Sequence, residues 1–238
     1  MESIAVIIPT YNERQNAGLL LPELKRRYRD ASIIVVDGGS SDGTADEIRR
    51  LERKYGGIAL LSNPKKEGLS TALQRGFRFA LNHKSAEWII SMDADFSHDS
   101  ADLERLVQVE EGAEMMIGSR YAVGGNSLAM GRARRFLSKL GNLYLRLLTG
   151  IPVRDITSGF VAYRRDLLRS LVARPLRTDG FSCQIEIKYR AVARRAKIKE
   201  IPIVFSKRRY GRSKFSLSIL CEGFFLPWLL RLDGSSFT

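Results

Sequence analysis

The fold is decided by residues 88–98, which read WIISMDADFSH. This stretch begins as a short apolar run and ends abruptly in two carboxylates, Asp93 and Asp95, followed by a hydroxyl and an imidazole. An apolar run of this length, bounded by turn signals, is typical of a buried strand. Because burying two unpaired carboxylates is costly, we expect both at the end of that strand. Their oxygens suit Mg²⁺ or Mn²⁺, which also bind phosphates; the alternative is a solvated loop after a core strand.

Three further apolar runs precede this strand, and each leads into helical sequence. The strands are predicted over residues 4–8, 33–36 and 58–61. The helix after the first strand should end near residue 29, the second should carry Ile48 and Leu51, and the third should span residues 71–81. Such short alternation predicts an α/β fold with a mostly parallel sheet and helices on both faces. Ligands of such sheets bind beyond the carboxyl ends of the strands. Polar clusters follow three of the four runs at that edge: Tyr11 with Glu13, Asp37, and Asp93 with Asp95.

Local signals predict where the first two helices begin. Pro9 is expected to end the first strand, because proline does not continue a central strand, and Asn12 is expected to cap the helix after it. Thr44 or Asp42 is expected to cap the second helix. The inner face of the first helix should carry four residues: Leu19, Leu20, Leu24 and Tyr28.

The second half of the chain continues the alternation less regularly. A helix is expected from Arg132, because apolar residues recur after it at helical spacing. The helix over residues 181–193 carries Gln184 and Glu186. The other expected elements are a helix near 100–109, a strand at 115–118, a turn with a strand-like segment at 155–163, a strand over 198–205 and a basic loop over 207–214.

Charge is distributed unevenly along the chain, whose net charge is +13. Residues 1–119 carry −4 and residues 120–238 carry +17. The basic half therefore suits an anionic partner: nucleic acid, a phosphorylated ligand or an acidic membrane surface. No motif of a nucleic-acid-binding protein is present, which argues against nucleic acid. A basic surface that only keeps the protein soluble is the remaining alternative.

The tail, residues 215–232, is mostly apolar but is interrupted by Glu222, Gly223 and Pro227. It is too short and too impure for a membrane-spanning helix, which needs about 20 apolar residues. An amphipathic helix lying in the membrane interface fits better, and a helix packed on the protein's own core is the alternative. We therefore predict a main domain over residues 1–214 and a tail over 215–238 that lies on a membrane, binds an anchoring partner subunit, or precedes an anchor.

Some classes of protein are disfavoured by what the sequence lacks. Neither GxGxxG nor GxxxxGK[ST] occurs, so neither the usual dinucleotide fold nor a P-loop is indicated. Cys183 and Cys221 are too few for a disulfide framework, and no signal peptide begins the chain, so we expect a reducing, cytoplasmic setting. His83 and His98 have no obvious catalytic partners and are expected to be structural or solvent-facing.

Eight stretches, taken together, resemble one known family. Residues 6–13 (VIIPTYNE), 37–44 (DGGSSDGT) and 93–95 (DAD) are similar to a family 2 glycosyltransferase of GT-A (Rossmann-like) fold. The chain departs from the family pattern at Gly38, where a second aspartate is usual, and at Ser97, where several relatives carry glutamine. The stretches that narrow the resemblance to dolichyl-phosphate mannose synthases are 66–69, 95–98, 118–121, 157–160 and 210–214.

The resemblance implies transfer of mannose, with inversion, from GDP-mannose to dolichyl or another polyprenyl phosphate at the cytoplasmic face of a membrane. It implies Mg²⁺ or Mn²⁺ as cofactor, and makes the chain a peripheral membrane enzyme. Because a phosphate acceptor is already anionic at neutral pH, this reaction needs no general base.

The family's functional residues carry over by position. Asp95 and Arg120 match the catalytic pair, and the metal would be bound by Asp93, Asp95 and Ser97. The acceptor phosphate would be bound by Arg120, Arg134 and Ser138. The nucleotide sugar would be bound by Pro9, Tyr11, Glu13, Val35, Asp37, Lys66, Asp93, Ala94, Asp95, Arg120, Arg208 and Lys214.

Three other activities remain open at this point. A sister enzyme would move glucose or another sugar from a UDP-sugar to polyprenyl phosphate. An enzyme that extends a polysaccharide would need a catalytic base for its hydroxyl acceptor, for which Glu186 is the candidate. A pseudo-enzyme would bind the nucleotide sugar but need a partner for turnover.

Overall fold

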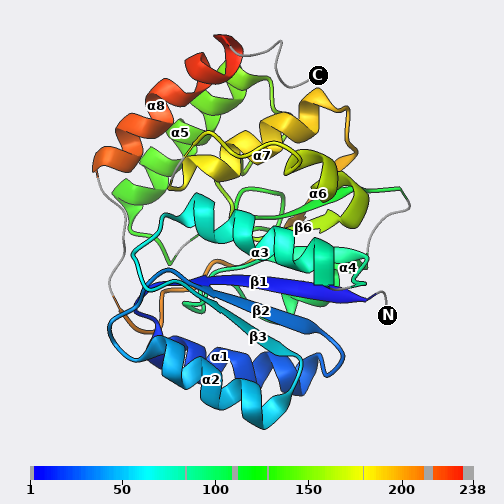
Figure 1. Ribbon diagram of the computed structural model, residues 1–238. Coiled ribbons are helices and arrows are strands. Elements are labelled where there is room, and N and C mark those ends of the chain that lie inside the picture. Colours follow the sequence, from blue (N-terminus) through cyan, green and yellow to red (C-terminus); the bar gives the residue numbers. More distant parts are fainter. Residues whose placement is uncertain are drawn as a thin grey trace.

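Seven strands of the described chain form one sheet, seen in the computed structural model in Figure 1. The structure describes residues 3–83, 85–108, 112–127, 129–178, 180–211 and 217–232. The strand order is β3-β2-β1-β4-β6-β5-β7, and only β6 is antiparallel to its neighbours. The strands are β1 (Ile4–Thr10), β2 (Ser32–Asp37), β3 (Ile58–Ser62), β4 (Trp88–Ser91), β5 (Met115–Ser119), β6 (Val161–Arg164) and β7 (Ile198–Pro202). The predicted α/β fold with a mostly parallel sheet is confirmed.

Helices cover both faces of the sheet. The helices α1 (Arg14–Arg27), α2 (Thr44–Tyr55) and α4 (Asp102–Val107) pack on one face. The opposite face holds α3 (Leu69–His83), α6 (Arg165–Leu171) and α7 (Ser182–Ala193). Beyond α7 lie α5 (Arg132–Thr149) and α8 (Leu217–Leu232), which run side by side at the top of Figure 1.

The apolar runs are continuous because the strands are buried on both sides. In β1, Val6 and Ile8 face the core under α1, whereas Ile7 faces Phe77 and its neighbours in the core under α3. Parallel strands require crossover connections, which the helices supply. The carboxyl ends of β1, β2 and β4 consequently lie together at one edge, where the polar clusters were predicted.

Three local predictions were wrong. The strand β1 continues through Pro9, which pairs with Val36; the ladder with β4 has already ended at Ile7, so the missing N–H breaks no pairing on that side. Asn12 has a φ of 55° and precedes the N-cap of α1, which is Glu13. Leu19 is 43% exposed, because the buried stripe of α1 runs through Ala17, Leu20, Leu21 and Leu24.

Two further elements differ from expectation. The N-cap of α2 is Gly43, in the left-handed region, although Asp42 does accept the Thr44 N–H at 3.0 Å. The same carboxylate accepts the N–H of Arg14, the first residue of α1, at 3.2 Å and so ties two helix starts together. Helix α6 was not predicted, because its seven residues are too few to show a period.

Candidate active site

Asp37 ends β2 at the floor of the carboxyl edge, and only 1% of it is exposed. One of its oxygens accepts the hydroxyl protons of Thr10, at 3.1 Å, and of Ser40, at 2.5 Å. The other accepts the Ser40 N–H at 3.0 Å. Asp37 therefore links the ends of β1 and β2 and fixes the turn that follows.

That turn approaches the backbone of the next loop closely. Gly39 has a φ of +81°, and a Cβ at this position would lie 2.8 Å from the carbonyl carbon of Lys65. Only glycine fits there without a backbone shift. The approach places Lys66 beside Tyr11, with its Nζ 5.1 Å from the ring centroid. Tyr11, Asp37 and Lys66 thus come from three separate segments of the chain to one wall of the site.

Arg208, which follows β7, joins two acidic residues from distant parts of the chain. Its guanidinium contacts Glu13 Oε1 at 2.7 Å and Asp95 Oδ2 at 2.9 Å. The other oxygen of Asp95 accepts the N–H of Ser97 at 3.0 Å and also its hydroxyl proton. Asn16 donates to Glu13 Oε2 at 2.6 Å. The structure therefore brings together four of the predicted site residues: Glu13, Asp95, Ser97 and Arg208.

Asp93 stands apart from this network. No other residue in the described part of the chain forms a hydrogen bond with its carboxylate. Burial raises the pKa of Asp93, an effect that His98 and Arg208 oppose and that the negative charge of Asp95 reinforces. An unpartnered carboxylate in a desolvated position is a group that a cation or a hydroxyl donor would stabilise.

The two histidines are structural or exposed, as predicted. His98 is 5% exposed and stacks on Phe160, with ring centroids 4.8 Å apart and planes 11° apart. Burial lowers the pKa of His98 and so favours the neutral imidazole. His83 lies exposed at the end of α3, beside the ring of Phe79.

Arg120 forms a two-pronged ion pair with Asp155, which sequence reasoning did not single out. Its Nε donates to one oxygen of Asp155 at 2.7 Å, and one of its terminal nitrogens donates to the other at 2.6 Å. The same terminal nitrogen also donates to Thr157 Oγ1 at 2.8 Å. The pair lowers the pKa of Asp155, and the attraction of Asp155 holds the pKa of Arg120 above its ordinary value. Arg120 is therefore a fixed positive charge. The sequence offers one indication that Asp155 could belong to the site, which is that it lies two residues before Thr157 in the predicted turn.

A basic cavity of about 360 Å³ lies beside Arg120. Two of its cations, Arg135 and Lys139, come from α5 and were not singled out in the sequence. Ser138 reaches its edge through a hydrogen bond from the Tyr121 hydroxyl at 2.7 Å. Arg134 lies exposed on the same helix. The full lining is Arg120, Tyr121, Ala122, Gly125, Asn126, Ser127, Arg135 and Lys139.

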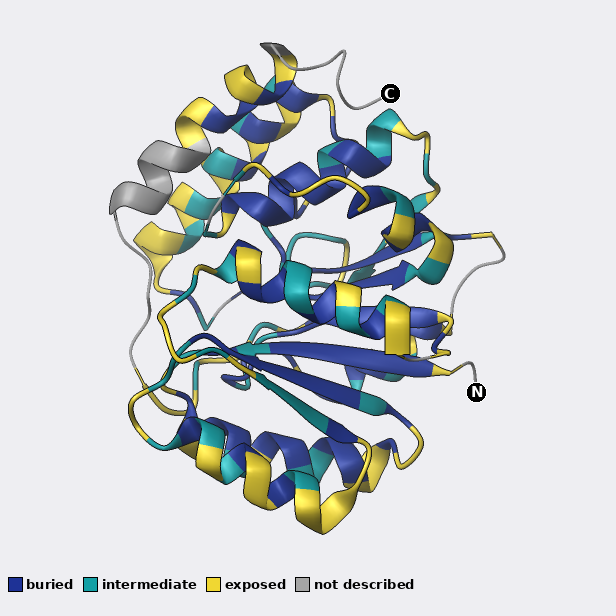
Figure 2. Cartoon of the chain, viewed as in Figure 1, coloured by how far each residue is buried: buried dark blue, intermediate teal, exposed yellow. Residues whose placement is uncertain are grey.

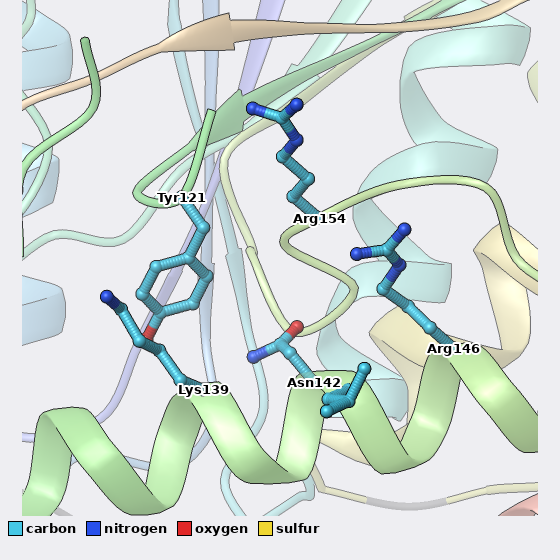
Figure 3. Close-up of a pocket in the computed structure, with 6 residues that line it drawn as sticks. Tyr121, Lys139, Asn142, Arg146 and Arg154 are labelled. Atoms are coloured by element: carbon cyan, nitrogen blue, oxygen red, sulfur yellow. The ribbon is translucent and has the colours of Figure 1, made fainter. Parts of the chain in front are cut away.

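A smaller cavity of about 180 Å³ adjoins the first through Tyr121 and Lys139 (Figure 3). In the close-up, the side chain of Tyr121 lies above α5, and those of Lys139, Asn142 and Arg146 project from that helix. Arg154 and Leu143 complete the lining. The two cavities together extend the positive charge from Arg120 along α5.

The remaining predicted site residues have simpler positions. Val35 is fully buried in the core under α1, in the middle of a strand that is paired with both β1 and β3. Pro9 is half-buried at the end of β1, and Ala94 is buried between the two aspartates. Lys214 lies outside the described residues.

Comparison with known proteins assigns the family. The sequence model of Glycosyl transferase family 2 matches residues 5–172, a range that includes β2 to β6 and all of β1 except Ile4. The chain belongs to glycosyltransferase family 2. The chain is therefore an enzyme of the transferase class, and the resemblance read from its motifs is confirmed.

Two relatives in this family are similar over most of their length. The polyprenol monophosphomannose synthase of Mycolicibacterium smegmatis is 38% identical over 224 residues, which cover 92% of this chain and 83% of the relative. The undecaprenyl-phosphate mannosyltransferase of Micrococcus luteus is 34% identical over 219 residues, covering 92% of this chain and 90% of the relative.

Solved structures that share little sequence with the chain support the GT-A fold. Glucosyl-3-phosphoglycerate synthase from Mycobacterium tuberculosis, in complex with UDP, aligns with a TM-score of 0.69 at 20% identity and covers 98% of this chain and 80% of its own. A second structure of the same enzyme, with Mn²⁺, UDP and glucosyl-3-phosphoglycerate, gives 0.66 at 21% identity over the same shares. At this identity the likeness concerns the fold.

Proposed function

We propose that this glycosyltransferase moves mannose, with inversion, from GDP-mannose to a polyprenyl phosphate such as dolichyl phosphate. The observation that carries the proposal is the basic cavity beside Arg120, next to the acidic carboxyl edge. Arg120, Arg135 and Lys139 suit an acceptor that is already an anion. The two mannosyltransferase relatives, whose names specify polyprenol and undecaprenyl phosphate, support the same acceptor class.

The donor is assigned to the carboxyl edge. Asp37, at the end of β2, and Tyr11 with Lys66 on the neighbouring wall would hold the nucleoside. About one acceptor position of Asp37 remains beyond its three hydrogen bonds from Thr10 and Ser40, since a carboxylate offers about four. Arg208, 2.9 Å from Asp95, would stabilise the diphosphate as it leaves.

A divalent cation fits the oxygen donors of Asp93, Asp95 and Ser97. The described residues contain no group of three or more His, Cys, Asp or Glu side chains placed to hold a metal. Mg²⁺ is often held by one or two carboxylates together with substrate phosphates and water. Structures of the M. tuberculosis enzyme hold Mn²⁺ or Mg²⁺ with UDP. When bound here, the cation would act as a Lewis acid on the leaving diphosphate.

The acceptor side needs positive charge but no base, because a phosphate monoester is already ionised at neutral pH. Glu186, the base that a hydroxyl acceptor would require, is fully buried on α7. Its carboxylate accepts the N–H groups of Arg177 and Thr178 at 3.0 Å each and the guanidinium of Arg190 at 2.6 Å. A carboxylate so completely engaged favours the lipid-phosphate acceptor over polysaccharide extension.

A lipid acceptor also requires contact with a membrane, which we assign to α5 and α8. Among the described helices none is long and apolar enough to span a bilayer. The two helices pack together through Tyr144, whose ring stacks on Phe224 at 5.3 Å, and leave large apolar side chains exposed (Figure 2). These are Phe136, Leu137, Leu140, Leu143 and Leu147 on α5 and Phe224, Phe225, Trp228 and Leu229 on α8.

This surface, called the α5/α8 apolar surface below, continues beside the basic cavity that α5 lines. An apolar face edged by arginines and lysines is typical of a helix lying at the headgroup level. Among the described side chains of this surface, five belong to α5 and four to α8. The surface would hold the enzyme peripherally at the membrane that carries its acceptor.

The deciding experiment is a panel of radiolabelled nucleotide sugars with a polyprenyl phosphate in liposomes, Mg²⁺ or Mn²⁺, and the purified chain. We expect label in the lipid phase with GDP-mannose and none with UDP-glucose or without the metal. Asp95→Ala is the control and should reduce transfer to background. Transfer of glucose from UDP-glucose, or turnover only after another protein is added, would overturn the proposal.

A further inference from the structure

Helix α7 carries a buried side-chain amide, that of Gln184, whose oxygen has no hydrogen-bond partner among the residues that the structure describes. Gln184 is 3% exposed, and its Oε1 is fully buried without a hydrogen-bond partner. No other described residue forms a hydrogen bond with either end of this amide. Buried polar side chains are nearly always paired, so a buried amide without a partner indicates a ligand that supplies one.

The position of this amide identifies the region of the site that it serves. A Cβ added at Gly159 would lie 3.6 Å from Gln184 Nε2 and 3.9 Å from Asp93 Oδ1. The amide of α7 and the carboxylate after β4 therefore face the same glycine, which has no side chain to separate them. Asp93 also has no hydrogen-bond partner in the described part of the chain.

Lys188, one turn further along α7, holds this arrangement in place. Its ammonium donates to the carbonyls of Ser158, at 2.8 Å, and of Gln184, at 3.2 Å. Helix α7 is thus fixed to the segment that carries Gly159. The backbone of Gln184 is therefore fixed, and its side-chain Oε1 is left without a hydrogen-bond partner in the described ranges of the chain.

We propose that Gln184 determines sugar specificity by forming a hydrogen bond with a hydroxyl of the hexose carried by the nucleotide-sugar donor. The inference rests on the proposed function and adds the residue that recognises the sugar. A hydroxyl both donates and accepts, so it satisfies the amide whichever of its ends is turned toward the site. A neutral amide is also the group that tolerates the neighbouring Asp93, because a second carboxylate there would add repulsion.

Glu186, the other acidic or amide side chain on this part of α7, cannot take this role. It is turned to Arg177, Thr178 and Arg190 on the opposite side of the helix. Only Gln184 among the two faces the site. The sequence spacing alone does not distinguish them.

The test compares binding of the donor with binding of the same nucleotide without its sugar. Isothermal titration calorimetry with Mg²⁺ present measures GDP and GDP-mannose against the wild-type chain and Gln184→Met, which keeps the volume but not the amide. We expect unchanged GDP affinity and an affinity for GDP-mannose about 10- to 100-fold weaker, the effect of one lost hydrogen bond to a buried group. Ile187→Val, on the same helix, is the packing control and should change neither.

Donor analogues that lack single hydroxyls identify the group that is recognised. The analogue without that hydroxyl should bind the wild type more weakly and should bind Gln184→Met with no further loss, whereas the other analogues lose equally in both. Gln184→Asn, which retracts the amide by one methylene, should show the same selective loss and keeps the test valid if Gln184→Met folds poorly.

Equal weakening of GDP and GDP-mannose in both variants would reduce Gln184 to a structural residue and overturn the inference, as would no change in either ligand. Failure of the proposed function is seen separately, in the wild type. If the wild type binds UDP-glucose instead of GDP-mannose, the donor assignment fails, and the same comparison with UDP and UDP-glucose decides the role of Gln184.

Discussion

Arg208 and Asp95 form an ion pair of 2.9 Å that joins the segment after β7 to the end of β4. The same guanidinium contacts Glu13 at 2.7 Å, so two carboxylates of the carboxyl edge share one positive charge. A cation bound at Asp95 would compete with this guanidinium for the same oxygens. Under the proposed function, Arg208 would therefore weaken the attraction of the site for a divalent cation before the donor arrives.

Arg208→Ala should strengthen binding of Mn²⁺ to the nucleotide-free protein, by about tenfold, because a neighbouring positive charge is removed. Transfer to polyprenyl phosphate should fall at the same time, since the diphosphate loses a stabilising charge. Electron paramagnetic resonance titration of Mn²⁺ measures the first effect. Arg209→Ala is the matched control, because Arg209 contacts Asp95 only through its backbone N–H. Weaker Mn²⁺ binding in Arg208→Ala would contradict this account.

Asp155→Asn should cost about 3–5 kcal/mol of unfolding free energy, because it leaves the guanidinium of Arg120 without its buried counter-charge. Urea denaturation of wild type and variant measures the difference. Asp166→Asn removes the partner of Arg169 in an exposed pair and should cost less than about 0.5 kcal/mol. Similar losses in the two variants would mean that the pair at Arg120 has no special role in stability.

Lys188 gives stability a pH dependence of unusual sign. Burial lowers its pKa to about 8 from an ordinary 10.5. Between these values the unfolded state binds more protons than the folded state, so this group makes stability rise with pH, by up to about 1.4 kcal/mol per unit. Below pH 8 both states are protonated and the contribution is constant.

Lys188→Met should abolish that rise. Urea denaturation at pH 7, 8, 9 and 10 measures the free energy of unfolding of both proteins. The wild-type value should increase relative to that of the variant only above pH 8. Parallel profiles for the two proteins would mean that the pKa of Lys188 is not lowered in the folded state.

Glu186→Gln distinguishes a structural carboxylate from a catalytic base. Because the carboxylate accepts hydrogen bonds from Arg177, Thr178 and Arg190, the variant should lose about 1–3 kcal/mol of stability. Transfer to polyprenyl phosphate should change by less than about threefold below the melting temperature. A loss of about 10²–10⁴-fold would instead identify a base and the polysaccharide-extending reaction.

Phe225→Ser with Trp228→Ser should weaken binding to liposomes that contain polyprenyl phosphate and an anionic phospholipid. Both side chains are more than half exposed on α8, and burying an aromatic side chain in the interface contributes about 1.5–3 kcal/mol. Flotation on a density gradient measures the loss. Leu19→Ser, on the exposed side of α1, is the control and should float like the wild type. Transfer to a short, water-soluble prenyl phosphate should persist in the double variant.

Much of the fold was predictable because its signals are local. The four apolar runs before residue 93 became β1, β2, β3 and β4, since strands buried on both faces read as continuous apolar sequence. Pro9 was misread because its conflict with pairing depends on where the neighbouring ladder ends, at Ile7. Helix α6 was not predicted, because it is too short to show a helical period in the sequence.

The residues of the candidate site also fall into two groups, those that the sequence indicated and those that only the structure revealed. The pattern of the sequence singled out Glu13, Asp37, Asp93 and Asp95, because polar residues that interrupt or follow apolar runs are conspicuous. Arg208 was added by the resemblance to the family. Asp155, Arg135, Lys139 and Gln184 had no such signal. Their importance follows from what lies across from them: Arg120, the basic cavity, and the glycine that faces Asp93.

The sequence by itself therefore determined the α/β class, the carboxylate edge and the family, since strand burial, turn chemistry and motif order are written along the chain. Only the tertiary structure decided that Glu186 is engaged while the amide of Gln184 is not, and that Asp93 is unpartnered while Asp95 is paired. Within each pair the residues lie two positions apart, and no local pattern separates them. The difference arises because hydrogen bonding and desolvation depend on neighbours that packing brings from distant parts of the chain.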